Sequence, residues 1–256
     1  GYLKVLTDPK YGYGSAINPC IDCRIFMFKR AKEYMKEIGA QFIFTGEVLG
    51  QRPMSQRTHP MRVIENDSEM EGLLLRPLSA KRLAVTVPEK EGWVDREQLD
   101  NIQGRSRQDQ MRLAREYGIE EYPSPAGGCC FLTDKNFARR IMDFFDYEGK
   151  ENLTMDDVML LKIGRHFRLS SECKVVMGRE EGENKFLNRY APGRWKMETM
   201  DATGPTTLIE GTPSEAELKL AAGMTARYAG VSDFSSARVQ FWRDDKEGVL
   251  DTAEVD

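Results

Sequence analysis

Four of the five cysteines stand in two short segments where thiol chemistry is possible. Cys20 and Cys23 are three residues apart at the start of a predicted helix, and Cys129 and Cys130 are adjacent in a later glycine-rich loop. Thiolates bind soft metals and act as nucleophiles, so these residues are candidates for metal ligation or sulfur transfer. Cys173 lies on a predicted strand, and we expect it to fill space without a chemical role.

An amphipathic helix positions the first pair of cysteines. Asn18 is a suitable N-cap and Pro19 suits the first helical position. Apolar residues then recur with helical spacing as far as Gly39, a typical left-handed C-cap. Residues three apart share a helix face, and the positive end of the helix dipole lowers thiol pKa values there. The sequence therefore predicts two thiolate-like sulfurs that point the same way.

The overall composition excludes some functional classes. The 256-residue chain has a net charge of −4 and no apolar run long enough to cross a membrane. This charge argues against nucleic-acid binding over the whole surface, but it allows a local basic face. An odd number of cysteines, a Cys-x-x-Cys spacing and no secretory segment favour the reducing cytoplasm, so we expect a cytoplasmic protein with no membrane partner.

The first half of the chain has an α/β pattern. Residues 41–45 predict a short buried strand, 57–66 a helix and 73–75 a second strand, and polar loops at 46–53 and 76–81 follow the two strands. Open parallel sheets bind ligands beyond the carboxyl ends of their strands, which is where these loops lie.

The pattern changes after Gly164. Helices are predicted before it, at about 106–117, 136–145 and 155–162. Short strands follow it, at 166–169, 174–177, 197–199, 206–209 and 239–242, with a capping-box helix from Ser214 to about Tyr228. We therefore predict a catalytic domain at 1–164, a small α+β module at 165–243 and a solvated acidic tail at 244–256.

Several of these motifs, in this order, resemble one enzyme family. The string from Asn18 to Cys23, the strand end Thr45-Gly46-Glu47 and the Gly-Gly-Cys loop with Cys129 resemble the tRNA thiolation enzymes of the PP-loop ATP pyrophosphatase superfamily. Residues 46–56 and 75–81 resemble its thiamine-biosynthesis-like bacterial branch, alongside the 2-thiouridylases and 4-thiouridine synthases. The resemblance implies that residues 1–164 are the C-terminal portion of a parallel-sheet domain similar to the adenine nucleotide alpha hydrolases.

The resemblance implies a reaction as well as a fold. In this family ATP, with Mg²⁺, adenylates a uridine carbonyl oxygen, and sulfur then replaces the adenylate. Cys23 and Cys129 would be catalytic, and Cys20, Cys23 and Cys129 would hold a 4Fe–4S cluster whose open iron binds sulfide. Alternatively, Cys23 and Cys129 act as a persulfide and a resolving thiol without a cluster. A further alternative is zinc bound by all four clustered cysteines.

Two departures from the family pattern qualify the resemblance. The nucleotide loop of form S-G-G-x-D-S is absent, so we expect the chain to be the later part of a longer enzyme. Cys130 stands where relatives more often carry an aliphatic residue, which leaves Cys129 as the better match. Thr45, Gly46 and Glu47 would then be the nucleotide-side residues that this chain supplies.

The C-terminal module resembles a second family. Residues 176–185, Gly204-Pro205 and the helix from Ser214 are similar to the NFACT-R RNA-binding domain. Together the resemblances imply a tRNA sulfurtransferase that receives sulfur from a cysteine desulfurase or sulfide and could form a homodimer. The different-class alternative is a non-catalytic, metal-stabilised RNA-binding protein. Candidate RNA or phosphate contacts are Arg52, Arg76, Arg105, Arg107, Arg165 and Arg168.

Overall fold

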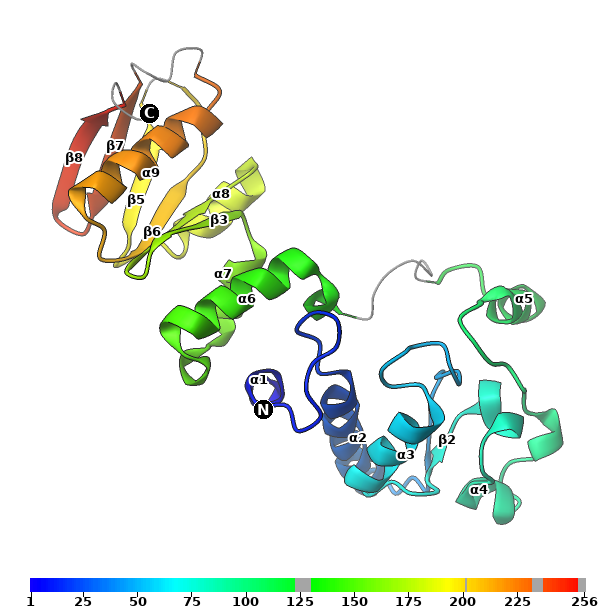
Figure 1. The fold of residues 1–256 in the computed structure, drawn as a ribbon. Coiled ribbons are helices and arrows are strands. Elements are labelled where there is room, and N and C mark those ends of the chain that lie inside the picture. The colour runs from blue at the N-terminus through cyan, green and yellow to red at the C-terminus, as the bar shows by residue number, and fades with distance from the viewer. Residues whose placement is uncertain (123–129, 201, 232–236, 253–256) are drawn as a thin grey trace. The chain divides into compact units, whose positions relative to one another are not determined.

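The computed structural model describes residues 1–122, 130–200, 202–231 and 237–252, which form two compact units (Figure 1). The units are Gly1–Ala138 and Arg139–Asp256. In the described ranges, no helix is both long and apolar enough to span a membrane.

The first unit is mainly helical. α2 (Cys20–Glu37) is its longest helix, and the core places Ile25, Phe28 and Met35 of this helix against residues of α3 and the following strand. This apolar spacing confirms the predicted amphipathic helix. The other elements are α1 (Tyr2–Thr7), β1 (Ile43–Phe44), α3 (Thr58–Asp67), β2 (Leu74–Leu75), η1 (Pro77–Arg82), α4 (Val87–Lys90), η2 (Arg96–Gln98), α5 (Gln108–Glu116), η3 (Phe131–Thr133) and the first residues of α6 (Lys135–Glu148).

The ends of α2 confirm one predicted cap and correct the other. Gly39 has φ +71°, the left-handed conformation predicted for it. Pro19 is the N-cap, and Asn18 makes no side-chain cap to the helix. The predicted Asn18 cap is therefore wrong, because its amide group is directed to a sulfur atom.

β1 and β2 form a parallel pair, with Ile43 opposite Leu74 and Phe44 opposite Leu75. α3 lies between them in the chain, so the predicted strand, loop, helix and strand succession is confirmed. The pair is only two residues long, and Phe44 is 72% exposed, so the expectation of a buried first strand is wrong at this residue. A wider PP-loop parallel sheet stays a prediction.

The second unit contains a six-stranded antiparallel sheet in the order β3-β4-β6-β5-β7-β8. All five predicted strands are present, and the capping boxes at Thr154 and Ser214 are confirmed. The elements are η4 (Lys150–Asn152), α7 (Met155–Lys162), β3 (Arg165–Ser170), β4 (Cys173–Met177), α8 (Glu181–Asn188), β5 (Trp195–Thr199), β6 (Thr207–Gly211), α9 (Glu215–Tyr228), β7 (Arg238–Arg243) and β8 (Lys246–Asp251).

Helices cover both faces of this sheet. Figure 1 shows α9 across one face, where Ala222 and Ala226 pack with Val175 and Val239 of the strands. Alternate strand residues point to the other face, where Leu160 of α7 and Leu187 of α8 pack with Val176 and Leu208. The sheet is therefore the middle layer of a three-layer module.

The second unit begins before the predicted boundary at residue 164. Arg140 of α6 donates to the Leu161 and Gly164 carbonyls, both at 2.9 Å. Asp143 of the same helix accepts a 3.0 Å hydrogen bond from the Arg168 Nε atom on β3. These hydrogen bonds connect α6 with the end of α7 and with β3 of the sheet. The hydrophobic pattern of the helices does not predict them, because polar side chains form them.

The predicted acidic tail instead contains β8. The strand pairs along its whole length with β7, and Leu250 packs against the core. Asp244 has φ +52° in the hairpin turn between the two strands, a conformation that Asp tolerates in turns. The acidic residues therefore belong to a turn and a paired edge strand as far as residue 251.

Candidate thiol site and RNA-binding module

Three thiols line one cavity of about 150 Å³ in the first unit. Cys20 and Cys23 reach it from the first turn of α2, and Cys130 reaches it from the residue before η3. This confirms that the helix-start thiols point the same way. The other lining residues are Tyr2, Asn18, Pro19, Arg24, Met27 and Ser55.

Each helix thiol has its own hydrogen-bond donor. The Asn18 amide nitrogen lies 3.1 Å from the Cys20 sulfur. The Tyr2 hydroxyl donates to Cys23, and the pKa of Tyr2 is raised well above its ordinary value. Burial is the largest cause, followed by the hydrogen bond to Cys23 and by electrostatic interactions with Cys23, Cys130 and Cys20. Tyr2 is thus within electrostatic range of all three sulfurs.

Cys130 is the loop cysteine found at this cavity. Cys129, predicted as catalytic and as a metal ligand, lies outside the described residues. Among the residues that are described, no group of three or more His, Cys, Asp or Glu side chains is arranged to hold a metal ion. The role of Cys129, as the third metal ligand or as the partner of Cys23 in sulfur transfer, thus stays a prediction.

Cys173 differs from the cavity thiols. It is fully buried in the core of the second unit, and its pKa is raised to about 11, mainly by burial and then by the charge of Glu217. A thiol with so high a pKa is a poor nucleophile at neutral pH. This agrees with the expectation that Cys173 fills space.

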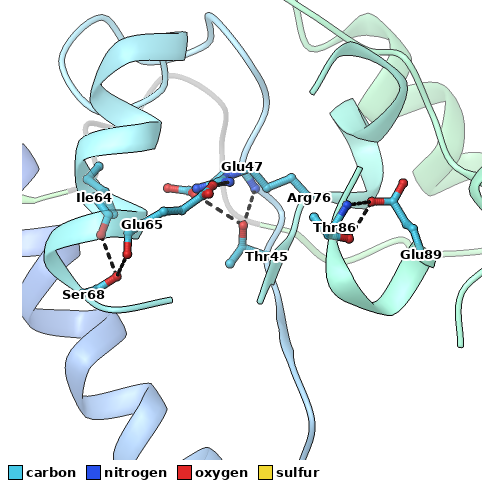
Figure 2. Close-up of polar contacts among 8 residues, drawn as sticks. All are labelled: Thr45, Glu47, Ile64, Glu65, Ser68, Arg76, Thr86 and Glu89. Atoms are coloured by element: carbon cyan, nitrogen blue, oxygen red, sulfur yellow. Dashed lines mark hydrogen bonds and ion pairs between the residues drawn. The ribbon is translucent and has the colours of Figure 1, made fainter. Parts of the chain in front are cut away.

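The predicted nucleotide-side residues directly follow β1, and Figure 2 shows two of them, Thr45 and Glu47. Glu47 is only 4% exposed, and its Oε2 atom lies 3.1 Å from Arg76 Nε and 3.4 Å from Thr45 Oγ1. Gly46 is exposed, and a Cβ atom added there would meet no protein atom within 4 Å. Protein packing therefore does not require glycine at this position.

Arg76 is part of a buried ion-pair network. Its Nη1 atom pairs with Glu65 of α3, its side chain is 3% exposed, and its Nη2 atom has no hydrogen-bond partner among the described residues. A phosphate-facing Arg76 was predicted because the residue follows a strand. Two carboxylates already neutralise the guanidinium group, and phosphate binding by Arg76 stays a prediction.

Arg24 joins this network to the thiol cavity. Its Nε atom lies 3.3 Å from Glu47 Oε1, and the same side chain lines the cavity beside the cysteines. The predicted nucleotide-side residue and the predicted thiol site are therefore separated by a single arginine. Nothing in the sequence pattern singled out Arg24, and Tyr2 also carried no sequence signal.

The other predicted RNA contacts have different surroundings. Arg105 is exposed, while Arg52 and Arg107 are half-buried in the first unit. In the second unit Arg165 lies 4.6 Å from the Tyr228 ring centroid. Arg168 donates two hydrogen bonds to Asp143 and stacks on Tyr147, so contacts within the unit already occupy much of its guanidinium group.

His166 on β3 is a structural contact. Its Nε2 atom lies 2.8 Å from the Ile163 carbonyl, and its Nδ1 atom is buried without a described partner. Burial, followed by the positive charges of Lys174 and Arg140, lowers its pKa to about 3. The imidazole is therefore neutral at physiological pH.

Residues 164–255 match the family model of the NFACT protein RNA binding domain. The match covers about a third of the chain and confirms the resemblance found for the C-terminal module. It supports RNA as a partner. The resemblance of residues 1–164 to the PP-loop enzymes has no counterpart in this match and stays a prediction.

Comparisons with curated proteins and with solved structures do not assign a fold to the chain. No curated protein matches the chain. A solved structure, the C-terminal part of the fibronectin/fibrinogen-binding protein from Streptococcus suis, aligns over 90% of this chain and 85% of its own. Its identity of 9% and TM-score of 0.31 are too low to assign a fold.

Proposed function

We propose that this chain carries the sulfur-transfer and RNA-binding parts of a tRNA-uridine sulfurtransferase. The observation that supports the proposal is the cavity lined by Cys20, Cys23 and Cys130, in a chain that also contains an RNA-binding domain. Replacing a base oxygen by sulfur requires a thiol that carries or accepts sulfur and a surface that holds the RNA. Both requirements have candidates here.

In the first form of the proposal, Cys20, Cys23 and Cys129 would hold a 4Fe–4S cluster. Bound there, the cluster would supply an iron with an open position for sulfide. The Asn18 amide would donate to the Cys20 sulfur and the Tyr2 hydroxyl to Cys23, and such hydrogen bonds tune the potential of sulfur-ligated iron. Cys130 also lines the cavity, but Cys20, Cys23 and Cys130 as described are not arranged to hold a metal ion, so Cys129 stays the proposed third ligand.

In the second form, the thiols act without a cluster. A persulfide on Cys23 attacks the adenylated carbonyl carbon of uridine, and the adenylate leaves with the carbonyl oxygen. The thiolate of the resolving cysteine, Cys129, then attacks the Cys23 sulfur. The S–S bond of the persulfide breaks, the outer sulfur stays on the base, and a protein disulfide forms, which a cellular thiol must reduce. Cys130 could replace Cys129 as the resolving thiol.

The proposal includes ATP and Mg²⁺ because the uridine carbonyl oxygen must be adenylated before sulfur replaces it. No adenylation step is assigned to the described residues. Thr45, Gly46 and Glu47 remain the proposed nucleotide-side residues, with Glu47 joined to the thiol cavity by Arg24. In the form with a cluster, free sulfide would supply the sulfur, whereas in the form without a cluster a cysteine desulfurase would deliver persulfide sulfur to Cys23.

A second candidate is a non-catalytic RNA-binding protein stabilised by a metal such as zinc. The family match at 164–255 supports RNA binding without requiring a reaction. The engagement of Glu47 and Arg76 in internal ion pairs also favours a structural role for these two residues. This candidate would be favoured if the purified protein contained zinc and if loss of the gene left tRNA thiolation unchanged.

The experiment that separates the candidates measures thiouridine in tRNA by nucleoside mass spectrometry. Cells lacking the gene would be complemented with the wild type or with Cys→Ala variants. We expect the wild type to restore thiolation and Cys23→Ala to fail, while the core variant Cys173→Ala serves as the matched control. Thiolation retained in Cys23→Ala would refute the site.

The two forms of the proposal differ at Cys20. Loss of both iron and thiolation in Cys20→Ala, with protein purified without oxygen, would support the cluster. Full thiolation in this variant would support the persulfide route. Cys129→Ala and Cys130→Ala, compared side by side, identify the third thiol.

A further inference from the structure

The second unit has a cavity of about 400 Å³ that is separate from the thiol site. Its volume is within the range of pockets that hold small molecules and nucleotides. The lining residues come from α7, from α8 and its C-terminal end, and from the loop before β5. They are Asp156, Phe186, Arg189, Tyr190, Pro192 and Arg194.

One wall of this cavity is aromatic. Phe186 lies in α8 and Tyr190 just beyond the end of this helix, and their ring centroids are 5.1 Å apart. Tyr190 also packs against the core formed by Leu160, Leu187 and Leu208, which fixes its ring. Both rings are half-buried and so remain accessible in part. A fixed, partly open aromatic pair provides a surface on which a planar base can stack.

Two arginines complete the cavity. Arg194 is held by a 3.1 Å hydrogen bond to Glu210 and a 2.9 Å bond to the Tyr190 carbonyl. Arg189 is exposed, and in the described part of the chain it forms no ion pair. An exposed guanidinium group without a carboxylate partner suits a phosphate, to which it can donate two parallel hydrogen bonds.

Asp156 lies on the α7 side of the cavity. Asp156 and Tyr190 line the same cavity. The pKa of Tyr190 is raised by burial and then by the charge of Asp156. A carboxylate in this position can accept a hydrogen bond from a base amino group or a ribose hydroxyl. The cavity thus combines a stacking surface, a phosphate-binding cation and an acceptor.

We infer that this cavity binds one nucleotide of single-stranded RNA, with the base on Phe186 and Tyr190 and a phosphate on Arg189. The inference rests on the RNA-binding role of residues 164–255 and is independent of thiolation. A stacked base also accounts for RNA binding by a chain with a net charge of −4, since stacking needs fewer cations than a broad phosphate surface does.

The other basic and aromatic contacts of this unit are less suited to a nucleotide. Arg165 stacks on Tyr228, and Lys196 lies 4.8 Å from the Trp242 ring centroid. In each case the protein's own cation covers the ring that a base would need. Arg168 is held by Asp143. Arg165 and Tyr228 nevertheless provide a well-defined alternative site to test.

The test measures fluorescence anisotropy of a labelled short single-stranded RNA, and of the matching duplex, with the full chain over a range of salt concentrations. Phe186→Leu keeps an apolar side chain and removes the ring, so we expect the dissociation constant to rise about tenfold. Arg189→Gln should raise it several-fold and make the slope of log K against log salt shallower by about 0.7. Binding of the single strand should exceed that of the duplex.

The matched control is Lys185→Gln. Lys185 is also an exposed cation of α8, but it pairs with Glu181 at 2.5 Å and does not line the cavity. Binding by this variant should equal that of the wild type. Thermal melts would confirm that all the variants are folded.

Three results would overturn the inference. Unchanged binding by folded Phe186→Leu and Arg189→Gln would exclude the cavity. Weakened binding in Arg165→Gln or Tyr228→Leu would then place the site on the other face of the sheet. If the wild type bound no RNA, the RNA-binding role itself would fail. Absence of thiolation with the RNA-binding pattern intact would refute only the proposed reaction.

Discussion

The Arg24 Nε atom lies 3.3 Å from Glu47 Oε1, while the Arg24 side chain also lines the cavity of Cys20, Cys23 and Cys130. Through Arg76, the same glutamate is connected to Glu65 on α3 (Figure 2). The end of β1, the start of α2 and the last turn of α3 are thus linked by a series of ion pairs. A substitution of any side chain in this series of ion pairs should therefore affect the position of the thiols.

Arg76→Met should strongly destabilise the first unit. It leaves Glu47 and Glu65 without their shared partner, and Glu47 is almost fully buried. We expect a loss of about 3–5 kcal/mol in the free energy of unfolding. Chemical denaturation monitored by circular dichroism would measure it.

Arg112→Met is the control for this substitution. Arg112 and Glu116 form an exposed pair on α5, with side chains that are 55% and 58% exposed. Removing such a pair should change stability by less than about 0.5 kcal/mol. Equal effects of Arg76→Met and Arg112→Met would show that the buried network does not hold the unit together.

Asn18→Asp should slow alkylation of Cys20. The substitution keeps the shape and retains an oxygen that can accept from the Ala16 N–H, but it replaces the donor to the Cys20 sulfur by a negative charge. The thiolate loses a stabilising hydrogen bond, so the rate at neutral pH should fall about tenfold. Iodoacetamide labelling followed by peptide mass spectrometry gives the rate for each cysteine.

Cys23 in the same samples is the internal control, because its donor is Tyr2. Its alkylation rate should change much less than that of Cys20. If both rates fell together, the variant would have disturbed the whole cavity, and the specific role of Asn18 would be wrong.

Lowering the pH from 7 to 5 should destabilise the second unit through His166. The folded pKa is about 3, below the ordinary value of 6.5, because the charged imidazolium is disfavoured by burial. The unfolded chain therefore binds a proton that the folded chain does not, and stability falls as the pH drops below about 6.5. The loss at pH 5 should reach up to about 2 kcal/mol.

His166→Gln should remove most of this pH dependence, although it lowers stability at pH 7. Carboxylates with lowered pKa values, such as Asp143 and Glu183, lose their stabilising contribution only at more acidic pH. Urea denaturation at the two pH values measures the difference. A variant that loses as much stability as the wild type between pH 7 and 5 would rule out His166 as the source.

Gly211→Ala should destabilise the second unit by about 3 kcal/mol or more. Gly211 has φ +90°, and an added Cβ atom would lie 1.9 Å from the Glu172 carbonyl oxygen, in the backbone of the neighbouring hairpin. The backbone would have to move apart at the end of the β4–β6 pair. Thermal and urea denaturation would quantify the loss.

Gly230→Ala separates the clash from the backbone conformation. Gly230 also has a positive φ, +68°, but no atom lies within 4 Å of an added Cβ. We expect it to cost about 1 kcal/mol, since only the left-handed conformation is penalised. Similar losses in the two variants would mean that the contact with Glu172 is unimportant.

The local elements could be predicted from the sequence, because their signals come from neighbouring residues. The apolar spacing of α2, the left-handed Gly39 and the capping boxes at Thr154 and Ser214 depend only on neighbouring residues, and all are confirmed. Alternation of apolar residues also predicted most strands of the second unit. β8 was missed because its acidic residues concealed the short alternation that ends at Leu250.

Which side chains meet could not be predicted in the same way, because it depends on long-range packing. Cys130 and Tyr2 join the thiols of α2 from distant parts of the chain, and Arg24 pairs with Glu47 across a helix and a strand end. Arg76 directly follows a strand, and long-range packing brings Glu47 and Glu65 to its guanidinium group. The periodicity of a sequence fixes which face of an element a side chain occupies. The partner on that face depends on how the elements pack.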